Sequence, residues 1–213
     1  NHSRKIEKDM AGVFTRTRLI DGFQFDIGRD LTGYEDGTEN PEGDEAIEAA
    51  IVRNAGPGQD GGSFIAIQQW RHDFDAFDAM TPVQQDDAIG RHRQSNEEFD
   101  APASAHVKRT AQESFDPEAF IVRRSMPWSD ASGSGLVFIA FGHNFDAFET
   151  LMQNMIGSND GIVDGLFGFT RPETGAYYWC PPLDNMENLD LSALIRESVT
   201  EPFYSAVSRY GPY

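Results

Sequence analysis

From residue 62 onward, apolar positions recur with the periods of strands and helices in alternation. Residues 63–70 form a β-branched and aromatic run bounded by glycines, which predicts a strand. In residues 73–80 the Phe and Met side chains recur at helical spacing, and residues 81–90 begin with Thr-Pro and end on Gly, as helices often do. This part of the chain therefore predicts one strand followed by two short helices.

The second half of the chain continues the alternation. Residues 119–126 and 136–141 are apolar runs separated by a turn rich in Gly and Ser, which predicts a hairpin. Residues 145–155 carry aromatic, Leu and Met side chains at helical spacing before a closing glycine. Residues 175–180 predict a last strand, which stops at two prolines.

The predicted order is strand, helix, long insert, strand, strand, helix, strand, which is the βαββαβ order of a ferredoxin-like fold in the α+β class. The insert, residues 91–117, is polar and shows neither period, and loops of such length are usually functional or disordered. The chain is predicted to have three parts. Residues 1–61 are irregular apart from a helix over 43–54, and residues 62–183 form the ferredoxin-like domain. Residues 184–213 form a tail with short helices over 191–198 and 202–209.

Charge and composition narrow the classes of partner. The 35 Asp and Glu residues against 17 Lys and Arg give a formal charge of −18, which repels nucleic acid and anionic membrane surfaces. No apolar run approaches the roughly 18 residues of a membrane span. From these two observations we expect neither nucleic acid nor a membrane as partner. The single cysteine, Cys180, excludes an internal disulfide and is typical of a reducing compartment, so we expect a cytoplasmic protein.

Three residues are candidates for chemistry, because the chain lacks Gly-x-Ser-x-Gly, a phosphate-binding glycine loop and a cysteine zinc site. His106 lies in the long insert, where an imidazole can reach a cavity. Asp36 lies in a segment with Asp-Gly and Asn-Pro pairs, which are common in turns. Arg123 is a cation within an apolar strand, which is costly unless it is paired or faces a polar cavity. Taken singly, a surface histidine and a turn aspartate are the simpler interpretations of the first two.

Seven segments follow one another along the chain: residues 29–41, which contain Gly-Tyr-Glu-Asp-Gly, and residues 62–73, 89–91, 104–107, 120–124, 135–141 and 170–178. Together they resemble the dye-decolorizing peroxidase family of haem enzymes, over roughly residues 20–183. Seven segments in order are more specific than any one of them. The resemblance implies an enzyme that binds haem b, reduces hydrogen peroxide and oxidises a small-molecule reductant.

The resemblance also implies an architecture. Members of the family have two ferredoxin-like domains, and the Gly-x-x-Asp-Gly motif lies near the start of the C-terminal, haem-binding one. Here the motif begins at Gly33, so residues 1–61 are expected to belong to the haem domain. An N-terminal domain is expected outside these 213 residues, and the protein is expected to be a homo-oligomer.

Residue by residue, the resemblance assigns the two sides of the haem. His106 resembles the proximal iron ligand, Asp36 the distal carboxylate and Arg123 the distal arginine. Cleavage of peroxide needs these three types, because an axial imidazole donates electron density to the iron, a carboxylate moves a proton, and a fixed cation stabilises developing negative charge. Phe138 is a candidate to border the porphyrin, although an ordinary core position explains it equally simply.

Further positions are assigned in the same way. Asp164 resembles the acidic residue that accepts a hydrogen bond from the ligand imidazole. Two alternatives to Asp164 stay open, because Asp160 is close by and some members carry a carboxylate where this chain has Gly168. Ser125 stands where some members carry a distal Asn. Arg91 is a candidate partner of a haem propionate, and a cation that merely ends a helix is an equally good interpretation.

The donor is the least defined part of the prediction. Large donors would be oxidised at the surface through aromatic side chains, for which the candidates are Tyr177, Tyr178, Trp179, Trp128 and Trp70. The charge of −18 favours phenols or cations such as Mn(II) over anionic dyes. His72 and His143 lack a partner at metal-ligand spacing and are expected to be structural. Two alternatives stay open: a haem-binding or haem-handling protein with little turnover, and an inactive fragment that lacks its partner domain.

Overall fold

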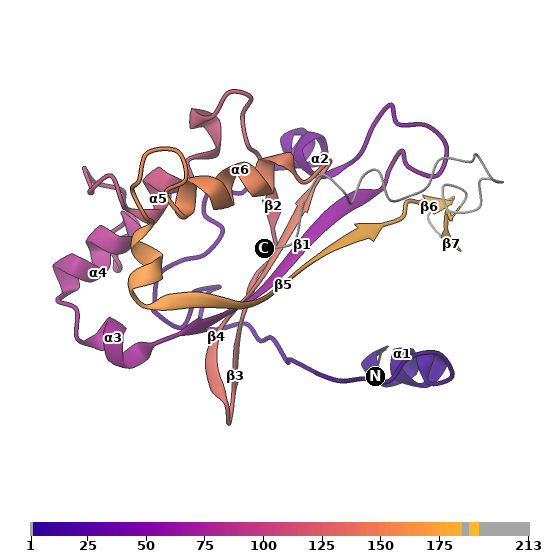
Figure 1. Cartoon of the computed structure of the whole chain (residues 1–213), viewed down its shortest axis with the longest axis horizontal. Coiled ribbons are helices and arrows are strands. Elements are labelled where there is room, and N and C mark those ends of the chain that lie inside the picture. The colour runs from indigo at the N-terminus through magenta and orange to yellow at the C-terminus, as the bar shows by residue number, and fades with distance from the viewer. Residues whose placement is uncertain (1, 185–187, 192–213) are drawn as a thin grey trace.

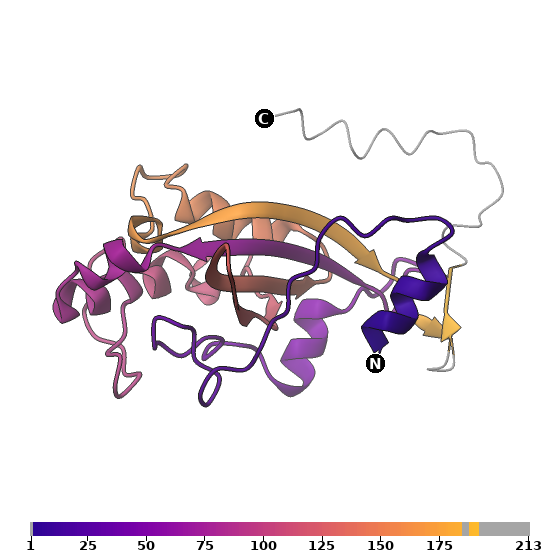
Figure 2. The same ribbon diagram turned by 90° about the horizontal axis from the view of Figure 1, so that it is seen from below.

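A central antiparallel sheet organises the chain, of which the computed structural model describes residues 2–184 and 188–191. Its strands are β1 (Ser63–His72), β2 (Val122–Arg123), β3 (Met126–Asp130), β4 (Gly133–Gly142) and β5 (Thr170–Cys180). β1 lies between β4 and β5 (Figure 2). β2 and β3 pair with the other edge of β4. This strand order is that of a ferredoxin-like sheet, so the α+β, ferredoxin-like prediction is confirmed. β6 (Leu183–Asp184) and β7 (Asn188–Leu189) form a separate pair.

The helices are short, and several of them gather on one side of the strands (Figure 1). They are α1 (His2–Met10), α2 (Gly43–Ala50), α3 (Phe74–Asp78), α4 (Pro82–Ile89), α5 (His106–Arg109) and α6 (Asp146–Met155), with 3₁₀ turns η1 (Gln112–Ser114) and η2 (Gly165–Gly168). Both views place α1 at the end of the molecule far from α3 and α4 (Figures 1 and 2). Two of these elements, α5 and η1, lie within the long insert that showed no period.

The two faces of the sheet carry different elements, because successive side chains of a strand point to opposite faces. Ala140 of β4 packs in a core cluster with Phe148 and Leu151 of α6. The next residue, Phe141, packs against a different cluster, which contains Ala49 and Ala50 of α2. Helix α6 therefore covers one face and α2 a corner of the other.

The strand predicted over residues 119–126 is wrong as a continuous element. The chain forms β2 over only two residues, and β3 begins at Met126. The side chain of Asn40 explains the short β2, because its amide accepts a hydrogen bond from Arg123 N at 2.8 Å and donates one to Arg123 O at 3.1 Å. An asparagine from the N-terminal segment thus takes the place of a neighbouring strand.

The bounds of two further elements, β5 and α2, also differ from the predicted ones. β5 begins at Thr170, five residues before the predicted start at Gly175, and tolerates Pro172 because the register with β1 shifts beside it. α2 ends at Ala50 instead of Asn54, because Val52 leaves the helix and exchanges backbone hydrogen bonds with Gly61 and Gly62. The two helices predicted in the tail lie outside the described residues.

Candidate active site

A cavity lies between the sheet and the helices on its covered face, with about 1010 Å³ of empty space when the open solvent at its mouth is included. β1 and β4 supply one wall and α6 another, and the apolar lining includes Leu136, Phe138, Phe148, Leu151, Met152 and Met155. The same cavity is lined by several ionisable side chains, namely Asp30, Glu35, Asp36, His72, His106 and Arg123. It is thus a mostly apolar hollow with a few polar groups, the usual form of a small-molecule or cofactor site.

His106 is the first residue of α5, and the end of α4 fixes where α5 begins. Gly90 ends α4 with φ of +97°, and a side chain there would collide with Val107, the neighbour of His106. The imidazole Nδ1 lies 2.8 Å from Asp164 Oδ2. Asp164 has a side chain with 0% exposure, and its other oxygen accepts the backbone N–H of Leu166. A buried carboxylate at Nδ1 makes that nitrogen the donor and leaves Nε2 with a free lone pair.

Asp36 and Arg123 line the same cavity from other elements. Burial raises the pKa of Asp36 above its ordinary value; the negative charge of Asp30 adds to this, while Arg123 and His106 act in the opposite direction. Arg123 is placed by the backbone hydrogen bonds to Asn40, and its buried Nε has no hydrogen-bond partner among the described residues. An unsatisfied buried donor at a cavity wall is costly unless a bound group accepts from it.

His72, which the sequence led us to regard as structural, lies at the cavity wall. Its Nε2 is 3.0 Å from Asp30 Oδ1 and its Nδ1 is 2.7 Å from Thr170 Oγ1. Asp30 is held in turn by the N–H and the hydroxyl of Thr32. The alternation along β1 could have indicated this, because Gln68 lines the cavity and every second residue of a strand shares its face.

Comparison with known proteins places this site in a family. The sequence pattern described as "Dyp-type peroxidase, C-terminal" matches residues 28–185. The chain belongs to this family. Dye-decolorizing peroxidase from Mycolicibacterium paratuberculosis is 31% identical over 191 residues, which cover 86% of this chain and 54% of that protein. The chain spans about half the length of the curated relatives it matches.

Solved structures of Dyp-type proteins share the fold. The dye-decolorizing protein from V. cholerae is 34% identical with a TM-score of 0.76, over 84% of this chain and 60% of that one. A variant of DypB from Rhodococcus jostii, solved in complex with heme, is 28% identical with a TM-score of 0.81, over 88% of this chain and 63% of that one. Another variant of the same DypB was solved in complex with manganese.

The structure of this Dyp-type chain brings some of the predicted site residues together and not others. His106, Asp36, Arg123 and Phe138 line one cavity, and Asp164 lies directly behind His106. Of the alternatives to Asp164, Asp160 is paired with Arg109, and Gly168 lies in η2. The arrangement is therefore an imidazole backed by a carboxylate, in one hollow with a second carboxylate and a guanidinium.

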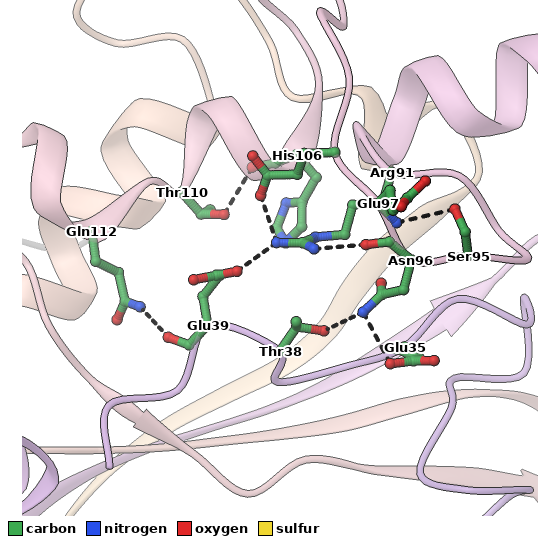
Figure 3. Close-up of polar contacts among 11 residues, drawn as sticks. Glu35, Thr38, Glu39, Arg91, Ser95, Asn96, Glu97, His106, Thr110 and Gln112 are labelled. Atoms are coloured by element: carbon green, nitrogen blue, oxygen red, sulfur yellow. Dashed lines mark hydrogen bonds and ion pairs between the residues drawn. The ribbon is translucent and has the colours of Figure 1, made fainter.

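Arg91 and Ser125 do not line the cavity of the Dyp-type chain. The guanidinium of Arg91 forms ion pairs with Glu39 and Glu98 and donates to the backbone oxygen of Asn96 (Figure 3). Its charge is thus already balanced by two carboxylates. The Ser125 hydroxyl accepts a weak hydrogen bond from Ile139 N at 3.4 Å.

Among the described residues, none of the helices is long and apolar enough to cross a membrane.

Proposed function

We propose that the cavity holds haem b and that the chain is the haem-binding part of a peroxidase, which reduces hydrogen peroxide at the expense of a small-molecule reductant. The observation that carries the proposal is the pair of His106 and Asp164, placed at the same apolar cavity as Asp36 and Arg123. An imidazole whose Nδ1 donates to a buried carboxylate has the tautomer that a metal ligand needs.

The residues present fit the group. His106 Nε2 would bind the haem iron, and the carboxylate behind it would increase the basicity of the imidazole. The aromatic and aliphatic walls formed by Phe138, Phe148 and Leu136 suit a flat apolar macrocycle. The unsatisfied Nε of Arg123 provides a donor to a ligand on the distal side.

When bound, haem supplies the electron-transfer chemistry that peroxide cleavage requires. Asp36 would take the proton from one peroxide oxygen and return it to the other, the leaving one. Its raised pKa suits the acid half of this task, because a carboxyl that protonates more readily than usual is a better donor near neutral pH. Arg123 cannot act as an acid, but its fixed charge stabilises negative charge on the departing oxygen in a site shielded from water.

Of the five aromatic candidates for surface oxidation of large donors, Tyr177 has the best geometry. The residue is 50% exposed, and its ring lies 5.8 Å, centroid to centroid, from the ring of Phe148, which lines the cavity. Tyr178 is equally exposed but, as the next residue of β5, points to the opposite face. Trp128 is buried. Phenols and Mn(II) remain the donors that the charge of −18 favours.

An N-terminal domain would cover the sheet face opposite the cavity. Ile65, Ile67, Val137 and Ile139 are only partly buried there, and soluble proteins seldom leave so aliphatic a face open. A second copy of the chain is the other occupant, in keeping with the expected homo-oligomer, and the mass of the particle in solution separates the two. A cytoplasmic location stays a prediction.

Haem titration tests the proposed function. We expect wild-type protein to bind haem with a strong Soret band, and His106→Ala to lose the axial ligand and most of the affinity. His143→Ala is the control, because His143 is an exposed histidine whose imidazole contacts Ala49 O away from the cavity. Equal haem spectra of wild type and His106→Ala would contradict the assignment, and no binding by wild type would favour the incomplete-fragment alternative.

A further inference from the structure

His72 separates two hollows. It lines the buried cavity and also a more open, polar depression of about 820 Å³ on the outside of the chain. Phe169 and Thr170 line both hollows as well, and the outer one is bordered by Arg71, Asp73, Asp75 and Arg171. The imidazole itself is only 5% exposed. A buried ring with solvent-filled space on one side and a candidate active site on the other can pass a proton between them.

The hydrogen bonds fix where the protons of His72 lie. The single hydroxyl proton of Thr170 is donated to Arg71 O at 2.9 Å. The hydroxyl oxygen must then accept from His72 Nδ1, which therefore carries a proton. Nε2 lies 3.0 Å from Asp30 Oδ1, so a second proton must lie between these two atoms. The pair is either imidazolium with carboxylate or imidazole with carboxylic acid, and in both forms it holds one transferable proton at no net charge.

The proposed reaction needs protons from outside the cavity. Reduction of one peroxide to two waters consumes two electrons and two protons. Asp36 moves a proton from one peroxide oxygen to the other and so adds none. Arg123 does not release its protons, and His106 would be bound to iron. Among the remaining ionisable groups that line the cavity, the pair of His72 and Asp30 is the one that also borders the outer depression, through His72.

We infer that His72 and Asp30 form a proton relay that resupplies Asp36 from the outer depression, an inference that rests on the proposed function. The pair gives its shared proton to the Asp36 carboxylate, which becomes a carboxylic acid, and the pair becomes singly negative. A proton from water in the depression then replaces the one that the pair shared between Nε2 and Asp30, while Nδ1 keeps its own proton. One O–H bond forms at Asp36 for each proton taken from solvent, and no electron moves in this step.

The surroundings of His72 and Asp30 favour proton transfer from the outer depression to Asp36. The charge of Asp30 acts on Asp36, so the two carboxylates are electrostatically coupled. The rings of Phe74 and Phe169 stand edge-on to the imidazole and shield it from solvent. Of the charged groups that border the depression, Arg71 is paired with Glu173, and the Asp73 carboxylate caps α3 by accepting from Ala76 N.

Two substitutions at the pair test the relay in the haem-loaded protein. Asp30→Asn keeps the acceptor for Thr32 and the contact to Nε2, but its amide cannot pass on a proton; His72→Gln removes the ring. We expect either variant to bind haem, to react with the first equivalent of peroxide at the wild-type rate, and to lose about 10²-fold in steady-state turnover. Added imidazole should restore turnover in His72→Gln by carrying protons through the vacated space. His143→Gln is the control and should match wild type.

Imidazole nitrogen NMR of the chain without haem gives a readout independent of activity. The relay predicts that Asp36→Asn changes the pH dependence of the His72 ring nitrogens and leaves those of His143 unchanged. Wild-type turnover in both Asp30→Asn and His72→Gln would overturn the relay, and so would a loss that imidazole does not restore. A wild-type protein that binds no haem would instead contradict the proposed function, while the NMR coupling could still be measured.

Discussion

The Nδ1 of His106 donates to Asp164, a carboxylate 2.8 Å away with no solvent exposure. This contact ties the candidate ligand to η2, because the second oxygen of Asp164 accepts from Leu166 N. The pair sets both the orientation of the ring and the electron density at Nε2. Five predictions start from this ligand and extend to the residues around it.

Asp164→Asn should raise the reduction potential of bound haem and lower peroxide reactivity by about 10- to 100-fold, because an amide strengthens the basicity of the imidazole less than a carboxylate does. Spectroelectrochemistry of the haem-loaded protein measures the potential. Asp160→Asn is the matched control, because this nearby carboxylate pairs with Arg109 instead. An unchanged potential in Asp164→Asn would show that the contact does not tune the ligand.

Asp36 should make stability depend on pH in a defined direction. Burial raises its pKa in the folded state, so the folded protein binds more protons than the unfolded chain between the two values, and stability falls as pH rises through that window. Asp36→Asn should therefore stabilise the protein more at about pH 7 than at about pH 4. Urea unfolding at both pH values measures this difference. A stabilisation that is equal at both would contradict the burial of an ionisable group.

Asp30 should act in the opposite sense. Burial by itself would raise its pKa, but the hydrogen bond and charge of His72 outweigh this and hold the pKa below the ordinary value. A lowered pKa contributes stability that is present above the unfolded-state value and lost as pH falls through the folded one. Asp30→Asn should therefore cost stability at neutral pH and little in acid, in the same unfolding assay. A larger cost in acid than at neutral pH would rule out the pairing with His72.

Gly90→Ala should destabilise the chain by more than about 1 kcal/mol, since φ there is positive and the new methyl group would meet Val107. The strain falls at the start of α5, so haem affinity should drop as well. Thermal unfolding and haem titration report the two effects. Gly168→Ala offers a control, because that glycine has no atom within 4 Å of the added carbon and no positive φ. Similar losses of stability and haem affinity in both variants would mean that the close approach to Val107 is unimportant.

Tyr177→Phe should slow oxidation of bulky phenols and leave peroxide reactivity unchanged, because the ring stays in contact with Phe148 but no longer supplies a phenol that can be oxidised. Steady-state rates with one bulky and one small donor measure the selectivity. Tyr178→Phe is the comparison at equal exposure on the other face of the sheet. If the Tyr178 variant shows the larger loss, electrons leave by another route.

The sequence predicted those parts of the fold that depend on local pattern. The run that became β1 was predicted to within two residues at its end, and helix α6 to within one at its start, because each has a regular period and clear boundary residues. The break between β2 and β3 could not be predicted, since it depends on Asn40, which lies 83 residues from Arg123 in the chain.

The residues of the candidate site likewise fall into those that the sequence predicted and those that depend on contacts distant in the chain. His106, Asp36 and Arg123 could be placed together from the resemblance of their motifs, and the structure puts them at one cavity. His72 was missed because its partners, Asp30 and Thr170, are 42 and 98 residues distant in sequence. The two carboxylates that pair with Arg91 were also not visible in any local pattern, so its role at a haem propionate stays a prediction.

The central claim, that this chain uses haem to cleave peroxide, is tested most directly by rapid mixing of the haem-loaded protein with one equivalent of hydrogen peroxide while the absorption spectrum is recorded. We predict a fast change of the haem spectrum in wild type, slowed by about 10²- to 10⁴-fold in Asp36→Asn, because the carboxylate that moves the proton is gone. A wild-type protein that binds haem through His106 but whose spectrum peroxide leaves unchanged would contradict the account and identify a haem-handling protein instead.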